Sequence, residues 1–144
     1  MGLKSTTLKL SDIVYDDTVP FVPHITKARV IKVYDGDTFT IGFFQPHSDT
    51  PFRMAVRLLG IDTPELKPHS GLKTRTGVLK AKAAQSLLSS YILGQDVMLT
   101  EVSLDRYGRL LANVHCGDLN INKLMLDSQL AVPYDGGCKL HRYN

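Results

Sequence analysis

Three short segments of the sequence carry the side chains best suited to chemistry. The first is an Asp-Gly-Asp-Thr tetrapeptide at residues 35–38, and the second, residues 57–65, begins with an arginine and ends with two carboxylates. The third, residues 105–109, holds two arginines and a tyrosine beside a glycine. Carboxylates bind hard divalent cations and activate water, while guanidinium groups bind phosphate oxygens. The combination predicts metal-assisted hydrolysis of a phosphodiester.

Each charged side chain has a place in that chemistry. If the fold brings them together, Asp37 and Asp62 supply oxygen ligands for one divalent cation, with backbone carbonyls and water completing its coordination. No histidine or cysteine falls in the motifs, which favours Ca²⁺ or Mg²⁺ over zinc or copper, and Mn²⁺ stays open. Glu65 remains to activate water, and Arg57 and Arg109 to take up the charge that develops on the phosphate.

Structural interpretations compete with these assignments. An Asp-Gly turn is usually only a hairpin, and Asp35 is assigned to that turn. Arg57 could be a strand arginine paired with Glu65, since most such pairs are structural. The basic run at residues 67–82 is either a solvated face or a funnel for a phosphate backbone.

The elements that must position these residues follow from the apolar pattern. Residues 28–33 and 39–43 predict two strands of a hairpin around the Asp-Gly turn, and residues 54–61 predict a third strand. Alternation along that strand would place Arg57 on one face with Leu59 and Ile61. Strands are also expected at residues 97–102 and 110–115, around the third motif.

Two helices complete the predicted elements. The first would begin with Thr76 as its cap and end at Gly94, with Leu79, Ala83, Leu87 and Tyr91, flanked by Ala84 and Leu88, at helical spacing. The second fits residues 121–129, with Asn120 as its cap and with Leu124, Met125 and Ile121 facing inward. Residues 133–144 read as irregular.

This order predicts an α+β fold that is mainly β: a five-stranded OB-fold Greek-key barrel with two to three helices. We expect an N-terminal arm at residues 1–26 that could pack on the domain, the barrel domain at residues 27–135, and a tail at residues 136–144. The length of 144 residues fits one domain of this size.

The three motifs, in this order and spacing, resemble the staphylococcal-nuclease-like, or thermonuclease, family. The resemblance extends from Lys27 to Tyr134 and is carried by residues 33–38, 57–65 and 105–109. It implies an OB-barrel endonuclease that uses Ca²⁺ to hydrolyse DNA and RNA with little sequence preference, acting best on single-stranded substrate.

The resemblance also assigns roles to individual residues. The metal is held by Asp37, by Asp62 and by the carbonyl of Thr63, while Glu65 serves as the general base or positions the water. Arg57 and Arg109 contact the phosphate and stabilise the transition state. The remaining substrate contacts implied are Arg106 and Tyr107 beside a nucleotide phosphate and Tyr134 as a base-stacking ring.

The charge balance agrees with a polyanionic partner. Lys and Arg exceed Asp and Glu by 17 to 14, and outside residues 1–26 the balance is 15 to 11. A rival hypothesis is a catalytically inactive OB module that binds nucleic acid or protein. The retained carboxylates argue against it, because they would repel phosphate without contributing to binding.

Location and assembly are less constrained by the sequence. Cys116 and Cys138 are expected to be free thiols, and no window is apolar enough to span a membrane. We expect a soluble monomer, secreted or periplasmic if a signal peptide was removed and cytoplasmic otherwise. Gly2 with Thr6 fits a short N-myristoylation pattern that often arises by chance.

Overall fold

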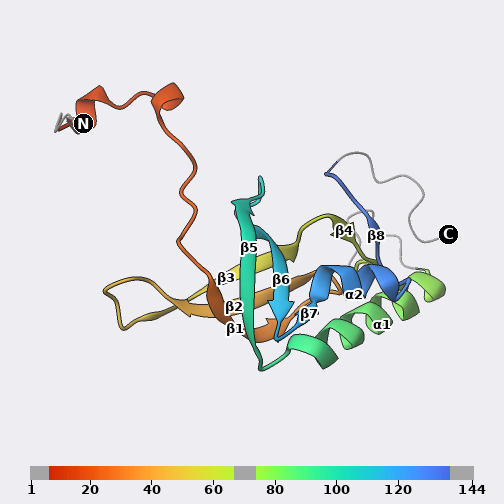
Figure 1. Ribbon diagram of the computed structural model, residues 1–144. Helices are drawn as coiled ribbons and strands as arrows, with labels where there is room; N and C mark the ends of the chain where they lie inside the picture. The colour runs from red at the N-terminus through yellow and green to blue at the C-terminus, as the bar shows by residue number, and fades with distance from the viewer. Residues whose placement is uncertain (1–6, 67–73, 137–144) are drawn as a thin grey trace.

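The computed structural model describes residues 7–66 and 74–136 (Figure 1). Neighbouring barrel strands are antiparallel except that β3 and β6 run parallel, and this pairing closes the barrel. The order, in which β1 pairs with both β2 and β5, is that of an OB fold and confirms the predicted class. The barrel strands are β1 (Lys27–Val33), β2 (Thr38–Phe44), β3 (Pro51–Leu58), β5 (Asp96–Leu104) and β6 (Leu110–Cys116).

The first three strands form the predicted meander. Phe39, Ile41 and Phe43 alternate with less buried residues along β2, because successive side chains of a strand point to opposite faces. Thr38 pairs directly with Arg57 in the β2–β3 register. This register places the Asp-Gly-Asp turn beside the end of β3, where the second motif begins.

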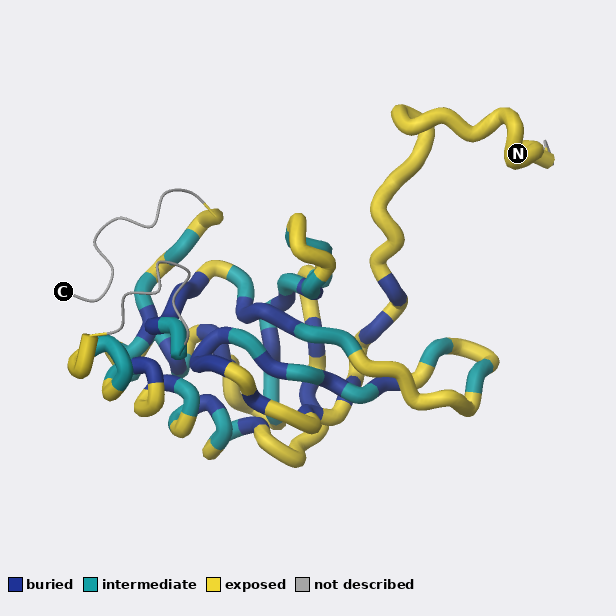
Figure 2. Tube along the Cα trace, turned by 180° about the vertical axis from the view of Figure 1, so that it is seen from behind, coloured by how far each residue is buried: buried dark blue, intermediate teal, exposed yellow. Residues whose placement is uncertain are grey.

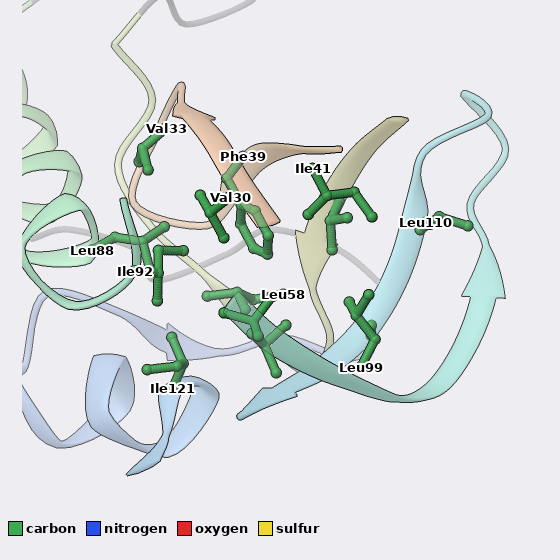
Figure 3. Close-up of a cluster of buried hydrophobic side chains, with 14 of the residues drawn as sticks. Val30, Val33, Phe39, Ile41, Leu58, Leu88, Ile92, Leu99, Leu110 and Ile121 are labelled. Atoms are coloured by element: carbon green, nitrogen blue, oxygen red, sulfur yellow. The ribbon is translucent and has the colours of Figure 1, made fainter. Parts of the chain in front are cut away.

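Apolar side chains from every barrel strand and from both helices fill the interior (Figure 3). Each fully buried large side chain contributes about 1.5–3 kcal/mol relative to leaving it in water. The labelled members include Val30, Phe39, Leu58, Leu88 and Ile121, all essentially inaccessible. This core holds the motif-bearing turns at fixed positions around the barrel.

Helix α1 (Arg75–Ile92) lies where a helix was predicted, and the predicted Ala84 and Leu88 are buried, but its cap and the rest of its buried stripe differ from the prediction. Its N-cap is Thr74, whose hydroxyl accepts a hydrogen bond from the Gly77 amide at 3.0 Å, so Thr76 lies inside the first turn. Leu79 is 59% exposed. The buried stripe is Ala81, Ala84, Leu88 and Ile92, a second set at helical spacing that places two small residues against the barrel. Gly94, at φ +74°, ends the helix as expected.

The third strand begins and ends three residues earlier than predicted. β3 ends at Leu58, and Gly60, at φ +81°, turns the chain into β4 (Ile61–Asp62). β4 pairs with β8 (Val132–Pro133), so the expected alternation of Arg57, Leu59 and Ile61 along one strand is wrong.

The C-terminal region has helix α2 (Ile121–Asp127), preceded by β7 (Leu119–Asn120). Asn120 caps the helix as predicted, by accepting a hydrogen bond from the Lys123 amide, but the helix ends two residues earlier than Gln129. Cys116 is a free thiol. Cys138 lies outside the described residues, as does Gly2.

The N-terminal segment leaves the barrel instead of packing along it (Figures 1 and 2). It contains two 3₁₀ turns, η1 (Leu10–Asp12) and η2 (Tyr15–Asp17), and only Pro23 and Ile25 at its end are buried. Among the described residues, no helix combines the length and apolar character needed to cross a membrane.

Candidate active site

The turn between β1 and β2 places two carboxylates at one end of the barrel. The Tyr34 and Asp35 amides both donate to the carbonyl of Thr38, at 2.9 and 3.1 Å, and fix the turn. Asp35 and Asp37 are only 8% and 6% exposed. Buried carboxylates need hydrogen-bond donors or cations, and the rest of the site supplies both.

Arg57 joins the two predicted metal ligands. Its Nη2 lies 2.9 Å from Asp62 Oδ1 and 3.4 Å from Asp37 Oδ2, and all three side chains are buried. The Thr63 amide donates to Asp37 Oδ2 at 3.2 Å, and the Thr38 hydroxyl donates to Asp37 Oδ1 at 3.0 Å. The structure therefore brings Asp37 of the first motif together with Arg57 and Asp62 of the second.

The turn at residues 59–60 makes this cluster possible. Because the chain reverses after Leu58, Asp62 returns towards Arg57, which an unbroken strand would not allow. Two backbone hydrogen bonds hold the turn, from the Leu59 amide to the Ala112 carbonyl and from the Tyr134 amide to the Gly60 carbonyl, both at 2.9 Å.

Asn122 is a residue that the sequence reasoning missed. Its Nδ2 donates to the carbonyl of Leu59 at 2.8 Å and its Oδ1 accepts from the Val114 amide at 2.9 Å. The side chain is buried in the first turn of α2 and ties that helix to β6 and to the turn beside Arg57. The available signal was its spacing, because Asn122 lies three residues before Met125, which was predicted to face inward.

The third motif forms a tight turn that holds Arg109. Asp105 accepts hydrogen bonds from the Tyr107 and Arg109 amides at 2.8 and 2.9 Å, and its Oδ2 lies 2.6 Å from Arg109 Nε. Partial burial alone would raise the pKa of Asp105, but these donors hold it below its ordinary value. The turn thus presents a positioned guanidinium on a partly exposed surface.

Tyrosine rings lie next to the arginines of the site. The guanidinium carbon of Arg57 lies 5.0 Å from the ring centre of Tyr134. Those of Arg106 and Arg109 lie 5.1 and 5.4 Å from the ring centre of Tyr107, which is 70% exposed. These distances are within the range of cation–π attraction, so the predicted substrate residues lie against the arginines of the site.

Electrostatics links the three motifs. The pKa of Asp35 is raised to about 6, chiefly by burial and also by the charges of Asp37 and Glu65, against the opposing effects of the Leu66 amide and Arg109. Burial also raises the pKa of Asp37, opposed by Arg57 and reinforced by Asp62. Asp35 therefore feels charges from all three motifs, as expected if they share one site.

Glu65 lies at the edge of this cluster. It is half-buried, and the next residue, Leu66, donates its amide to Asp35 Oδ1 at 3.3 Å. This bond fixes the backbone next to Glu65 beside the Asp-Gly-Asp turn. Residues 67–73 of the basic run lie outside the described residues, and Lys80 and Lys82 are on α1.

The donor set fits a hard divalent cation that completes its coordination with water. In the described ranges, no three acidic, histidine or cysteine side chains form a ready-made metal site. Asp37 and Asp62 nevertheless lie on one guanidinium, and a carboxylate oxygen has lone pairs beyond those used by a single donor. The adjoining Thr63 is 1% exposed, and its hydroxyl is buried without a hydrogen-bond partner.

Helix α1 sets the position of the Asp-Gly-Asp turn. A Cβ added to Gly36 would lie 2.5 Å from Ala84 Cβ and 3.0 Å from the Thr63 hydroxyl. Close approach to the helix, instead of an unusual φ, is what requires glycine here. The backbone between Asp35 and Asp37 thereby lies directly against α1.

Comparison with known proteins identifies relatives of this chain. The family model described as "Staphylococcal nuclease homologue" matches residues 55–140, more than half of the chain. An "Uncharacterized endonuclease" of Escherichia coli is 31% identical over 108 residues, covering 74% of this chain and 60% of that protein.

Eukaryotic relatives show the same similarity. A "Probable endonuclease LCL3" of Yarrowia lipolytica is 32% identical over 129 residues, covering 75% of this chain and 55% of that protein. A "Probable staphylococcal-like nuclease CAN2" of Oryza sativa is 34% identical over 71 residues, 49% of this chain and 17% of that protein. The chain thus spans about 60% or less of the length of these relatives.

Proposed function

Since this chain belongs to the staphylococcal nuclease homologue family, we propose that it is an endonuclease that hydrolyses phosphodiester bonds of DNA and RNA with Ca²⁺ as cofactor. The observation that carries the proposal is the buried contact of Arg57 with Asp37 and Asp62, beside Glu65 and Arg109. A module that only binds nucleic acid has no use for this concentration of carboxylates. The names of the endonuclease relatives support the same activity.

Each site residue has a role in hydrolysis that follows from its chemistry. Arg57 and Arg109 bind non-bridging phosphate oxygens and stabilise the charge that develops there. Glu65 accepts a proton from the attacking water. Asp37, Asp62 and the Thr63 carbonyl would hold the cation, which when bound adds positive charge at the phosphate.

The exposed ring of Tyr107 and the half-buried ring of Tyr134 support a preference for unpaired substrate. Tyr107 and Tyr134 can stack only on bases that are not held inside a duplex, which favours single-stranded or frayed substrate. Stacking does not distinguish strongly among bases, in agreement with low sequence preference.

Cleavage of a fluorogenic single-stranded DNA with Ca²⁺, Mg²⁺, Mn²⁺ or chelator tests the proposal. Glu65→Gln should lower turnover on the order of a hundredfold or more, as for loss of a general base. Glu101→Gln is a matched control, because Glu101 is an exposed acid on β5 outside the three motifs. Salt-sensitive binding of the oligonucleotide without cleavage under any condition would instead support the inactive binding module.

Metal binding is tested without turnover. Ca²⁺ should raise the thermal unfolding midpoint of the protein, because a ligand that binds only the folded state stabilises it. Asp62→Asn should abolish that rise while Glu101→Gln retains it. An equal rise in all three proteins would place the cation elsewhere.

A further inference from the structure

Residues 7–22, called the arm below, are exposed along their whole length (Figure 2), and several of them are large and apolar. Leu10, Tyr15 and Val19 are 88%, 90% and 85% exposed. Soluble monomers rarely expose apolar residues in such a continuous series, which normally marks a surface that contacts a partner. The other apolar residues before Phe21 are Leu8, Ile13 and Val14.

An apolar pocket of about 380 Å³ opens at the root of the arm. Phe43 of β2 and Phe52 of β3 form part of its lining, with their ring centres 6.3 Å apart, and Met54 and Leu104 add further apolar surface. Phe21, where the arm leaves the barrel, contributes to the lining as well. The molecule therefore carries both an unburied apolar segment and an unfilled apolar pocket.

Charge makes these two features complementary. The arm contains Lys9 and three aspartates, which gives it a net charge of −2. Arg53 lies at the pocket and is exposed, and Gly108, which also lines the pocket, belongs to the same turn as Arg106. An acidic apolar segment and an apolar pocket with an exposed arginine are therefore complementary in charge.

We propose that the arm of one copy inserts its apolar residues into the pocket of a second copy, and that the exchange is reciprocal. Because every chain carries donor and acceptor, two copies bury both features at once in a closed twofold dimer. Once one arm is bound, the second binds within the same complex, which strengthens the assembly. The arm runs away from its own barrel, so a second molecule is the natural acceptor (Figure 1). The inference does not depend on the nuclease activity, and it differs from the monomer expected from the sequence.

Light scattering coupled to size-exclusion chromatography of the full chain, at several concentrations, measures the assembly. We expect a dimer that weakens by at least about tenfold in dissociation constant when Leu10, Tyr15 and Val19 are all changed to serine. Phe52→Glu should weaken it as much, by placing a carboxylate at the pocket. Phe44→Glu is the matched control, because Phe44 is 64% exposed on the same hairpin and does not line the pocket.

Mixing the arm variant with the Phe52→Glu variant tests whether the arm of another copy fills the pocket. The arm variant keeps a normal pocket and the Phe52→Glu variant keeps a normal arm, so differently tagged copies should form a heterodimer with one exchanged arm. Thermal unfolding of each variant verifies that the barrel is folded. A wild-type chain that is monomeric at every concentration, or a dimer that neither set of changes weakens, would overturn the proposal.

Discussion

Arg57 and Arg109 are proposed to bind the same phosphate, but the molecule holds them in two different ways. Arg57 is buried between two buried carboxylates that come from different turns. Arg109 is about one-third exposed and is paired with Asp105 of its own five-residue turn. The first arrangement links catalysis to the stability of the whole fold, whereas the second can be altered locally. Breaking a buried ion pair is costly, and an exposed pair contributes little.

The largest effect is expected from Arg57→Ala. Turnover should fall on the order of a hundredfold or more, as for loss of a transition-state donor. Removing the guanidinium takes away the cation that two buried carboxylates share, so the free energy of unfolding in urea should also fall by about 3–5 kcal/mol. Arg57→Lys is the control: it retains the charge but not the planar fork, and should recover more stability than turnover.

Arg109→Ala should lower turnover without a comparable loss of stability. Turnover is expected to fall on the order of a hundredfold, while the unfolding free energy changes by less than about 1 kcal/mol. The same cleavage and urea assays measure both. A stability loss as large as that of Arg57→Ala would remove the distinction between the two regions.

Asp35→Asn tests the carboxylate that interacts electrostatically with both regions, with Asp37 in one and with Arg109 in the other. Burial raises the pKa of Asp35 to about 6, so the folded state binds the proton more tightly than the unfolded state and loses stability as the pH rises from about 4 to 6. The asparagine variant lacks this loss and should be more stable than the wild type at pH 8, by up to about 2 kcal/mol after allowance for solvent screening. Urea unfolding of both proteins at pH 4 and pH 8, with chelator present, measures this difference in stability. If the variant gained no stability relative to the wild type between pH 4 and pH 8, the prediction would be contradicted.

The smallest effect is expected from Asp105→Asn. Its pKa is lowered in the folded state, so its contribution is present at neutral pH and is lost as the pH falls through the lowered value. The variant should lose less than about 1 kcal/mol at pH 7 and should match the wild type in strong acid. A larger loss would mean that this turn, like the Arg57 cluster, supports the fold.

The elements formed by local signals were predictable from the sequence. The hairpin around residues 35–38 depends on alternating apolar residues and a turn sequence. Asn120 begins helix α2 by capping it, and Gly94 ends helix α1 with a positive φ, so both boundaries depend on local interactions. The motifs likewise identified the residues that the fold gathers, including Arg57 and Asp62.

What the sequence did not reveal depends on contacts between distant segments. Two stripes on α1 had helical spacing, and packing against the barrel core and against Gly36 decides which one is fully buried. The end of β3 at Leu58 depends on pairing of β4 with β8, more than 70 residues later. Asn122 was missed for the same reason, because its partner Leu59 lies 63 positions away.

The contact between Gly36 and Ala84 restricts which sequences this site can tolerate. No room exists for a larger side chain at either position unless the turn and the helix separate. The two positions are therefore expected to vary together among functional sequences, as a pair of small residues. A substitution at Ala84, on a helix that contributes no group to the chemistry, would be recorded in a mutational screen as a defect in catalysis.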